Sequence, residues 1–483
     1  MHDPRLIVAS NRGPVSFVRR EDGTLEARRG GGGLVTALSQ ALQESGGRWI
    51  ASAMTPEDRE AGREPFETGG GDTPSLQLRY LSFDDRVYEA FYNGISNRVL
   101  WFLNHRLWAL PREPVWGPDT DREWAAYRQV NEGFARALAE EGDRMSTDHA
   151  YLVQDYHLSL VPGMLRDLQP GAPISHFCHS AFPDPEYFAT LPARIRHELL
   201  MGLLGADILG FHTDRWARHF LDCCRELPGV STDDARRSVR LEDREVRVRV
   251  YPISVDPKGL KEAAAGTDVT RAERSIERWL GDSKLLLRVD RTDLSKNILR
   301  GLLAYKAFLR ENPRWRGRVV HLALLNPSRE AVPEYRQYLR ECMREVERIN
   351  AEMGSGTWQP VLAEVRDQHA RSLAAFGLYD VLLVNPLYDG MNLVAKEGPV
   401  LNRRDGVLIL SQNAGAHAEL APHALSINPF DIGETAAAIA TALDMGAEER
   451  ARRATGLREE VAQNHLDLWV RHQLRDLGEA RGG

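Results

Sequence analysis

Cysteine is scarce in this sequence of 483 residues, and long apolar runs are missing from it. The four cysteines (Cys178, Cys223, Cys224 and Cys342) lack the spacing of a zinc site and are too few for a disulfide scaffold in so long a chain. No apolar run approaches about 18 residues, the length at which a membrane-spanning helix becomes credible. The first residues also lack the apolar segment and cleavage site of a signal peptide. We therefore expect a cytoplasmic protein with no membrane partner.

An excess of one sign of charge is also missing. The formal net charge is −7, which gives no general attraction to nucleic acid, so a site for anions must be a local cluster of Arg and Lys. With 42% hydrophobic and 27% charged residues, the composition is that of a globular protein. A chain of this length exceeds what one hydrophobic core usually serves, so we expect two domains. The sequence leaves a homo-oligomer open.

Short apolar runs alternate with longer segments of helical period along the whole chain. The first half has such runs at 6–8, 49–51, 151–153, 174–178 and 208–211, and the second half at 285–289, 319–325, 381–384 and 407–410. This rhythm is typical of parallel sheets wrapped by helices. It predicts an α/β protein with two Rossmann-like, doubly wound domains.

Two prolines bracket a short extended stretch at 251–257, which indicates a domain boundary. We predict a first domain at 1–252 and a second at 253–464. The tail is helical in pattern, with Trp469 and Leu474 on an apolar side, and we expect 465–483 to return to the first domain.

A glycine-rich segment, Gly30 to Gly33, precedes the helical stretch 34–42, and Ser10-Asn11-Arg12 follows the first apolar run. Backbone N–H groups at a helix N-terminus favour phosphate, although a flexible surface loop explains the glycines equally well. The segment is neither a Walker loop nor a dinucleotide fingerprint, which disfavours nucleotide hydrolysis.

Polar and aromatic residues mark a second group of candidate positions in the first half. Asp155 and His179 each follow an apolar run, where ligands bind in open α/β sheets, and both can hold sugar hydroxyls. Tyr92 and Trp101 offer flat faces to a sugar, but core packing explains either ring alone.

In the second half, charged residues follow two of the apolar runs. Arg291 and Lys296 can converge on a pyrophosphate, the alternative being a solvated charged turn. Asp389 can accept from sugar hydroxyls, and the amides of 392–394 begin a helix aimed at phosphate. Glu397 can accept from ribose hydroxyls, or it is an ordinary solvent-facing charge.

These segments together resemble the trehalose-6-phosphate synthase family of retaining glycosyltransferases, which have the GT-B fold. The resemblance runs from Leu6 to about Phe430 and is strongest in DGMNLVAKE at 389–397, beside SNR, GGL, YNG-SNR-LW, DYHL, H-FP, R-D--K and PSR in the family's order. It implies two domains that face a cleft, no metal, and no cofactor beyond a nucleotide-sugar co-substrate. The expected reaction moves glucose, with retention, from a nucleoside diphosphate glucose to glucose 6-phosphate.

The resemblance also implies roles for individual residues. The positions that match its acceptor site are Arg12, Tyr92, Trp101, Asp155 and Arg329. The positions that match its donor site are Gly33, Arg291, Lys296, Asp389, Met391, Asn392, Leu393, Val394 and Glu397. The positions expected to act in catalysis are Asp155, His179, Arg291, Lys296 and Asp389.

Three departures from the family pattern bear on the donor. RTDLSKN carries Asn297 where glycine is usual, HSAFP carries Ala181, and 411–416 reads SQNAGA. This version resembles an actinobacterial branch in which some members use GDP-glucose in place of UDP-glucose, and we slightly favour GDP-glucose. The same branch is similar to the pseudo-glycosyltransferases of validamycin-type biosynthesis, but this chain keeps the whole YNG-SNR-LW motif. The alternatives are a glucosylglycerol-phosphate synthase, a cyclitol-coupling enzyme, and a sugar-phosphate sensor without activity.

Overall fold

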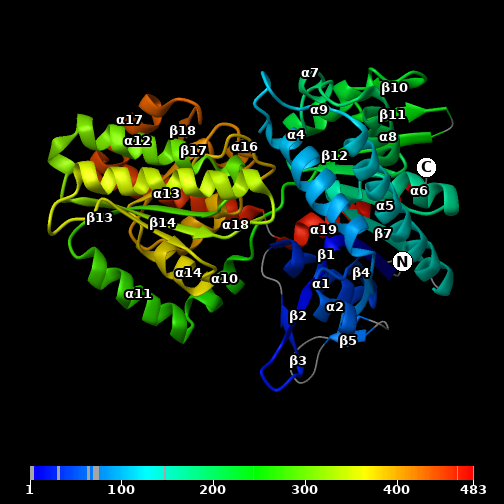
Figure 1. Cartoon of the computed structure of the whole chain (residues 1–483), viewed down its shortest axis with the longest axis horizontal. Helices are drawn as coiled ribbons and strands as arrows, with labels where there is room; N and C mark the ends of the chain where they lie inside the picture. Colours follow the sequence, from blue (N-terminus) through cyan, green and yellow to red (C-terminus); the bar gives the residue numbers. More distant parts are fainter. Residues whose placement is uncertain are drawn as a thin grey trace. The chain divides into compact units, whose positions relative to one another are not determined.

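The computed structural model describes residues 5–29, 33–62, 66–68, 76–145, 148–242, 244–464 and 466–481. The chain divides into two compact units (Figure 1). Unit 1 comprises Met1–Ile253 and Leu466–Gly483, and unit 2 comprises Ser254–His465. Each unit is built on its own, largely parallel sheet, which confirms the predicted α/β class with two parallel-sheet domains.

Unit 1 contains a sheet with the strand order β10-β11-β12-β9-β8-β7-β1-β4-β6-β5. The strands from β12 to β6 in this order run parallel, and the pairs β10-β11, β11-β12 and β5-β6 are antiparallel. Their bounds are β1 (Arg5–Arg12), β4 (Arg48–Ser52), β5 (Phe66–Thr68), β6 (Leu76–Leu81), β7 (His149–Gln154), β8 (Ile174–Cys178), β9 (Ile208–Phe211), β10 (Val230–Asp233), β11 (Ser238–Leu241) and β12 (Arg244–Val250). A separate hairpin joins β2 (Val15–Arg19) and β3 (Leu25–Arg29).

The helices of unit 1 are α1 (Gly33–Ser45), α2 (Pro56–Ala61), α3 (Asp85–Glu89), the π-helix η1 (Ala90–Leu100), α4 (Trp101–His105), α5 (Pro118–Arg144), the 3-10 turn η2 (Tyr156–Leu158), α6 (Val161–Leu168), α7 (Pro185–Phe188), α8 (Ala193–Leu203), α9 (Asp214–Cys224) and α19 (Leu466–Arg481). The longest of these, α5, begins with Pro118 and carries Asp119 and Asp121 in its first turn. Proline lacks the N–H that the first turn leaves unpaired, and acidic side chains favour the positive end of the helix dipole.

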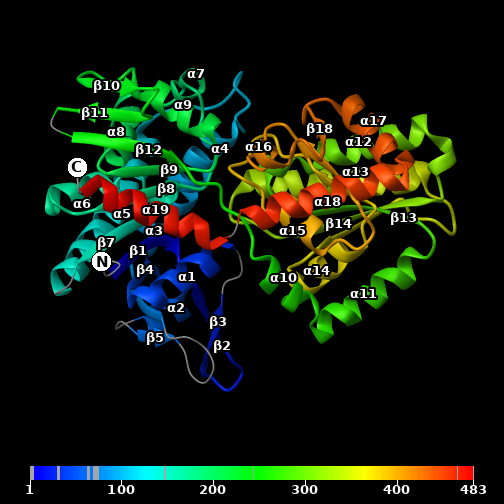
Figure 2. The same ribbon diagram turned by 180° about the vertical axis from the view of Figure 1, so that it is seen from behind.

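The C-terminal helix α19 belongs to unit 1, although it follows the whole of unit 2 in the sequence (Figure 2). Its Trp469 is 2% exposed and packs edge-on against Phe177 of β8, with 4.9 Å between ring centroids. Further along the helix, the Tyr251 hydroxyl donates a hydrogen bond of 2.7 Å to the carboxylate of Asp476. Burial of an aromatic side chain and one charge-assisted hydrogen bond therefore attach the helix to the unit 1 sheet.

Unit 2 contains a parallel sheet with the order β15-β14-β13-β16-β17-β18. Its strands are β13 (Lys284–Arg291), β14 (Val319–Asn326), β15 (Val361–Val365), β16 (Val381–Val384), β17 (Val407–Ser411) and β18 (Leu425–Ile427). Its helices are α10 (Pro257–Ala264), α11 (Thr267–Leu280), η3 (Leu294–Lys296), α12 (Ile298–Glu311), η4 (Pro313–Trp315), α13 (Pro333–Met353), α14 (His369–Leu378), α15 (Val394–Leu401), α16 (His417–Leu420), α17 (Ile432–Asp444) and α18 (Ala447–Gln463).

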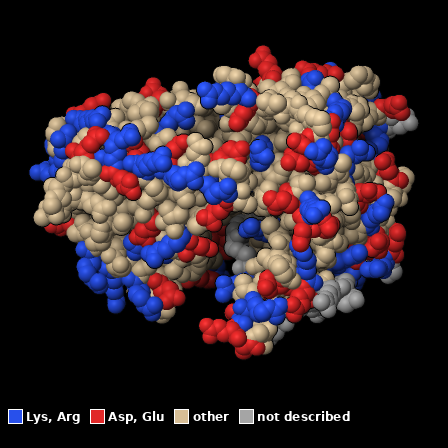
Figure 3. Space-filling view, in the orientation of Figure 1, with Lys and Arg blue, Asp and Glu red and all other residues tan. Residues whose placement is uncertain are grey.

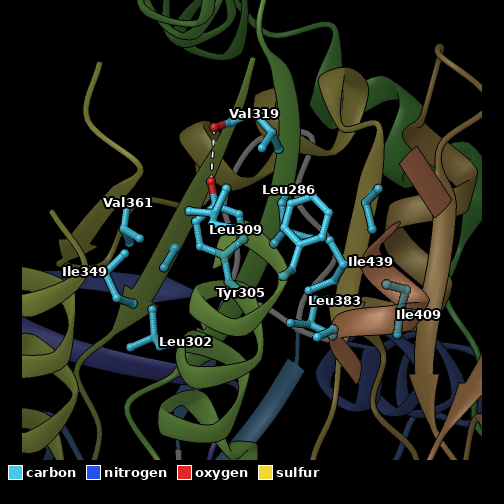
Figure 4. Packing of buried hydrophobic residues seen from close by; sticks show 14 of the residues in the cluster. Leu286, Leu302, Tyr305, Leu309, Val319, Ile349, Val361, Leu383, Ile409 and Ile439 are labelled. Carbon is cyan, nitrogen blue, oxygen red and sulfur yellow. Dashed lines mark hydrogen bonds between the residues drawn. The ribbon is translucent and has the colours of Figure 1, made fainter. Parts of the chain in front are cut away.

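The core of unit 2 lies between this sheet and the helices that cover it. Leu286 and Leu383 from neighbouring strands meet Leu302 and Tyr305 of α12 in a buried cluster (Figure 4). The buried Tyr305 hydroxyl donates to the carbonyl oxygen of Val319 at 3.0 Å, so its polar end is satisfied inside the cluster. A rigid core of this kind fixes where the loops at the strand ends begin.

The surface shows charges of both signs. Figure 3 shows Lys and Arg side chains lying among Asp and Glu across the face in view. Among the helices of the described ranges, none combines the length and the apolar character that crossing a membrane requires.

Candidate active site

Three predicted residues of unit 1 follow neighbouring parallel strands. Arg12 is the last residue of β1, Asp155 directly follows β7, and His179 directly follows β8. These strands are adjacent in the sheet in the order β8-β7-β1. Because parallel strands end at the same edge, the sheet brings the three positions to one side of unit 1.

The backbone of Asp155 is strained in a way that aims its carboxylate at the loop after β8. Its φ of 70° lies in a region that non-glycine residues rarely adopt, at a cost of roughly 1–3 kcal/mol. The carboxylate accepts the backbone N–H of His179 at 3.2 Å and lies 3.8 Å from Nδ1 of His157. Asp155 therefore links the loops that follow β7 and β8.

His179 carries a neutral imidazole. Burial lowers its pKa to about 3, so the ring is uncharged at neutral pH. Its Nε2 lies 2.9 Å from Oε1 of Gln154, a geometry in which Nε2–H donates and Nδ1 remains an acceptor. The rings of Phe177 and Trp469 pack beside it, with centroids at 4.6 and 5.6 Å.

The two predicted aromatic residues take different positions. Tyr92 lies on the π-helix η1 and stacks on the His157 ring, with 5.9 Å between centroids, so it contacts the loop that contains Asp155. Trp101 is only 8% exposed and stacks on His105 at 3.8 Å. Most of the Trp101 side chain is therefore packed in the core of unit 1, as the core-packing alternative expected. Gly33 is the first residue of α1, and residues 30–32 of the glycine segment lie outside the described residues.

Unit 2 has a cavity of about 230 Å³ at the carboxyl edge of its sheet. Six predicted donor-site residues line it, namely Arg291, Lys296, Asn392, Leu393, Val394 and Glu397. The cavity also has walls that sequence reasoning missed, namely Val289, Asp290, Asn326, Asp367, His369, Ser372, Leu373 and Phe376. Asp389 and Met391, which were predicted with the first group, are buried beside the cavity and are not part of its wall.

An ion pair joins the two charged motifs of unit 2. Lys296 of η3 and Asp389, from the loop after β16, form a salt bridge, and both side chains are largely buried. Asn392 donates from Nδ2 to the same carboxylate at 3.1 Å and has a positive φ of 78°. The pair holds the Lys296 ammonium at the cavity, and the turn at Asn392 leads directly into α15.

The loop that carries Asp389 is fixed against the loop that follows β17. The Ala416 N–H donates to the Met391 carbonyl oxygen at 2.7 Å, and the Gly415 N–H donates to the Asp389 carbonyl oxygen at 3.1 Å. A Cβ at Gly415 would lie 1.8 Å from the carbonyl oxygen of Gly390, so only glycine fits this approach. Residues 411–416 (SQNAGA) therefore support the loop that carries Asp389. Met391 takes part in this support through its backbone carbonyl oxygen.

Two carboxyl groups of the cavity have raised pKa values. Burial raises the pKa of Asp290 to about 6, against the opposing effect of Arg288, whose guanidinium lies 2.7 Å from its carboxylate. Burial alone raises the pKa of Glu397 to about 7. Carboxyl groups that ionise near neutral pH in a cavity are typical of functional sites.

Arg329 stands apart from the other predicted acceptor residues. It lies in unit 2, whereas Arg12, Tyr92 and Asp155 lie in unit 1. Its guanidinium pairs with the fully buried Asp293, and its side chain is 8% exposed.

A cavity lined by arginine, lysine and a helix N-terminus at the carboxyl edge of a parallel sheet is suited to a phosphorylated ligand. Unit 1 brings polar and aromatic side chains together at the same edge of its own sheet. Two Rossmann-like units of this kind are the architecture of the GT-B glycosyltransferases.

The chain belongs to glycosyltransferase family 20, whose model matches residues 4–479. It is 39% identical over 489 residues to the trehalose-6-phosphate synthase of Mycobacterium avium, covering 98% of this chain and 95% of that protein. It is 37% identical over 482 residues to the bifunctional trehalose-6-phosphate synthase/phosphatase of Thermoproteus tenax, covering 96% of this chain but 62% of that protein. The chain is thus an enzyme of the trehalose-phosphate synthase family, as its motifs predicted.

Solved structures of the family share the whole fold. The UDP-forming α,α-trehalose-phosphate synthase of Burkholderia vietnamiensis has a TM-score of 0.87 at 32% identity, covering 99% of this chain and 98% of that one. The E. coli enzyme bound with UDP-2-fluoro glucose has a TM-score of 0.84 at 30% identity, with 98% of each chain covered. The UDP-forming enzyme of Burkholderia xenovorans in complex with glucose-6-phosphate has a TM-score of 0.84 at 29% identity, covering 98% of this chain and all of that one. These similarities confirm the predicted GT-B fold.

Proposed function

We propose that this chain transfers glucose, with retention, from a nucleoside diphosphate glucose to glucose 6-phosphate and so makes trehalose 6-phosphate. The observation that carries the proposal is the unit 2 cavity, where Arg291, Lys296 and the start of α15 meet at one sheet edge. Two cations and a helix N-terminus can neutralise a diphosphate without a metal. The E. coli relative binds a UDP-glucose analogue, which supports the same class of donor here.

The acceptor is proposed to bind at the carboxyl edge of the unit 1 sheet. Arg12 supplies a cation, and Asp155 and the neutral His179 supply acceptors for sugar hydroxyls. Tyr92 supplies an aromatic face beside them. The Burkholderia xenovorans relative was solved with glucose-6-phosphate, which supports this acceptor.

The chemistry follows from charge placement. In front-face transfer, the departing diphosphate helps to deprotonate the incoming hydroxyl, so the enzyme needs no nucleophile of its own. Arg291 and Lys296 would take up the charge that develops on the leaving group, where preorganised cations act most strongly. Asp389 holds Lys296 in position through their ion pair, and binding of both substrates supplies proximity.

The base of the donor is the finer part of the proposal. The departures in the sequence slightly favoured GDP-glucose, but both Burkholderia relatives are UDP-forming and give that preference no support. The bifunctional relative extends well beyond the matched region, and its phosphatase activity is not part of the proposal.

Product analysis with the purified protein tests the proposal. UDP-glucose and GDP-glucose are offered separately with glucose 6-phosphate, glycerol 3-phosphate or a phosphorylated cyclitol, and the products are identified by mass spectrometry and NMR. Trehalose 6-phosphate with α,α linkage is expected. A product from glycerol 3-phosphate or the cyclitol alone would replace the proposal with one of the two enzyme alternatives.

A sensor is separated from an enzyme by measuring binding and turnover on the same sample. Calorimetry with nucleotide and with glucose 6-phosphate would show binding in either case. Absence of product with every donor and acceptor, despite binding of both, would reject the enzymatic proposal.

A further inference from the structure

One end of the unit 2 cavity carries groups that the transfer chemistry does not use. Asp367 and His369 line the cavity and follow β15, whereas Arg291 is the last residue of β13. Strand β14 lies between β13 and β15. At the usual spacing of roughly 4.8 Å per strand, the two ends of the cavity are about 10 Å apart.

A nucleoside diphosphate is long enough to span this separation. If Arg291 and Lys296 hold the phosphates near β13, the ribose and base extend towards β15. The cavity wall also includes Leu373 and Phe376 of α14, the helix that follows β15, and their apolar side chains suit an aromatic base. Asp367 then lies where the polar edge of the base arrives.

The carboxylate of Asp367 is available for a ligand. It is exposed and forms no hydrogen bond or ion pair with any other residue that the structure describes. The neighbouring cations are engaged elsewhere, since Arg366 donates to Glu364 at 2.9 Å and Arg371 also pairs with Glu364. The Asp367 carboxylate is therefore a charged hydrogen-bond acceptor at the β15 end of the cavity, where the base is expected.

The chemistry of the bases distinguishes which one a carboxylate can hold. Guanine presents two adjacent donors, N1–H and the N2 amino group, which match the two oxygens of a carboxylate. Uracil presents one N–H between two carbonyl oxygens, and these oxygens repel a carboxylate. We infer that Asp367 is the specificity-determining residue for the donor and selects guanine.

The inference rests on the proposed function, because it names the base of that donor. It also states where this chain would differ from the UDP-forming relatives, which share 32% and 29% of its residues.

Donor competition tests the inference on the full-length protein. The kcat/KM values for GDP-glucose and UDP-glucose, with glucose 6-phosphate as acceptor, are measured for the unmodified chain and for Asp367→Asn. We expect a preference for GDP-glucose, and a loss of about 10- to 100-fold in its kcat/KM in the variant, the range of one bidentate contact. The value for UDP-glucose should stay the same or rise. Asp367→Ala should act in the same direction.

The matched control is Asp282→Asn, which removes another exposed carboxylate of unit 2, beside the amino end of β13 and thus at the opposite edge of the sheet. It should leave both values unchanged. A preference for UDP-glucose in the unmodified chain, or an unchanged donor ratio in Asp367→Asn, would overturn the inference.

Calorimetry with GDP and UDP themselves gives a readout that is independent of transfer. The unmodified chain should bind GDP more tightly, and Asp367→Asn should lose that difference. Preferential GDP binding without any transfer would reject the proposed function and keep the base assignment. Equal binding of both nucleotides would reject the base assignment alone.

Discussion

The two units end their parallel strands in the same way but differ in the groups that follow the central strands. In unit 1 the groups that follow β7 and β8 include a neutral imidazole, with aromatic rings packed around it. In unit 2 the groups that follow β13 and β16 are ions, joined by the Lys296–Asp389 pair. One scaffold thus carries either a neutral hydrogen-bonding group among aromatic rings or fixed charge at its strand ends, depending on a few loop residues.

The two regions also keep their side chains in position by different means. Asp155 relies on a strained backbone, whereas Lys296 relies on a buried ion pair and the packed loops behind it. Strain persists only where the surrounding structure over-determines it. Unit 1 should therefore depend on packing, and unit 2 on charge.

The largest expected difference between the two units is the loss of stability caused by Trp469→Ala. The indole is 2% exposed and contacts Phe177 and His179, so its removal leaves a cavity under the unit 1 site. Loss of a buried tryptophan costs about 3–5 kcal/mol of stability. Hydrogen exchange followed by mass spectrometry should show lower protection in unit 1 and little change in unit 2. Trp469→Phe should recover part of the loss, and equal losses in both units would contradict dependence on packing.

Lys296→Ala tests whether unit 2 depends on charge. Removing one preorganised group that stabilises developing charge lowers kcat by about 10²- to 10³-fold. The KM for glucose 6-phosphate should change little, because the acceptor site is proposed in unit 1. Arg291→Ala should act in the same direction, and steady-state kinetics with both substrates varied measures the effect.

The control for Lys296 is Lys258→Ala, whose side chain is 87% exposed on α10 and pairs only loosely with Glu262 at 3.9 Å. It should have unchanged kinetics. A kcat for Lys296→Ala close to that of the unmodified enzyme would remove the cation from the mechanism.

The pH dependence of stability gives a third test, through Glu397 of unit 2. Its pKa rises from 4.5 to about 7 in the folded chain, so the folded state retains the proton longer than the unfolded state does. Stability from this group is therefore present below pH 4.5 and is lost as the pH rises to about 7. Relative to Glu397→Gln, the ligand-free protein should lose about 2–3 kcal/mol of unfolding free energy across this range.

Denaturation of both proteins at a series of pH values measures this difference. The comparison cancels the buried histidines, including His179, whose lowered pKa makes stability rise with pH over part of the same range. A difference that is constant with pH would show that the pKa of Glu397 is the same in the folded and unfolded chains, and would contradict the prediction.

Most of the sheet framework could be predicted from sequence because its strands are continuous apolar runs. The run at 381–384 is the whole of β16, and those at 174–178 and 208–211 match β8 and β9. Strands buried on both faces read in this way. By contrast, β15 is a half-buried edge strand that contains Glu364, and no apolar run marked it.

The same contrast explains which site residues could be predicted. Arg291 and Lys296 follow a strand that the sequence showed, whereas Asp367 and His369 follow the strand that it did not show. Asp290 was missed because it lies inside β13, and its raised pKa results mainly from burial in the folded chain, which spacing does not reveal. The π-helical course of η1 was also missed, since its motif carries no signal for that rare hydrogen-bond pattern.

The smallest effect is expected from Tyr251→Phe, which removes one hydrogen bond between α19 and the unit 1 sheet. The hydroxyl donates to Asp476 at 2.7 Å, and the residue is 3% exposed. Asp476 keeps Arg475 at 3.1 Å and Arg249 at 3.7 Å, so its charge stays partly compensated. The loss should therefore be only about 1–2 kcal/mol. Protection of α19 should fall while kcat stays unchanged, because the packing of Trp469 against His179 remains. A clear fall in kcat in Tyr251→Phe would show that the hydrogen bond, and not the aromatic packing, positions the imidazole.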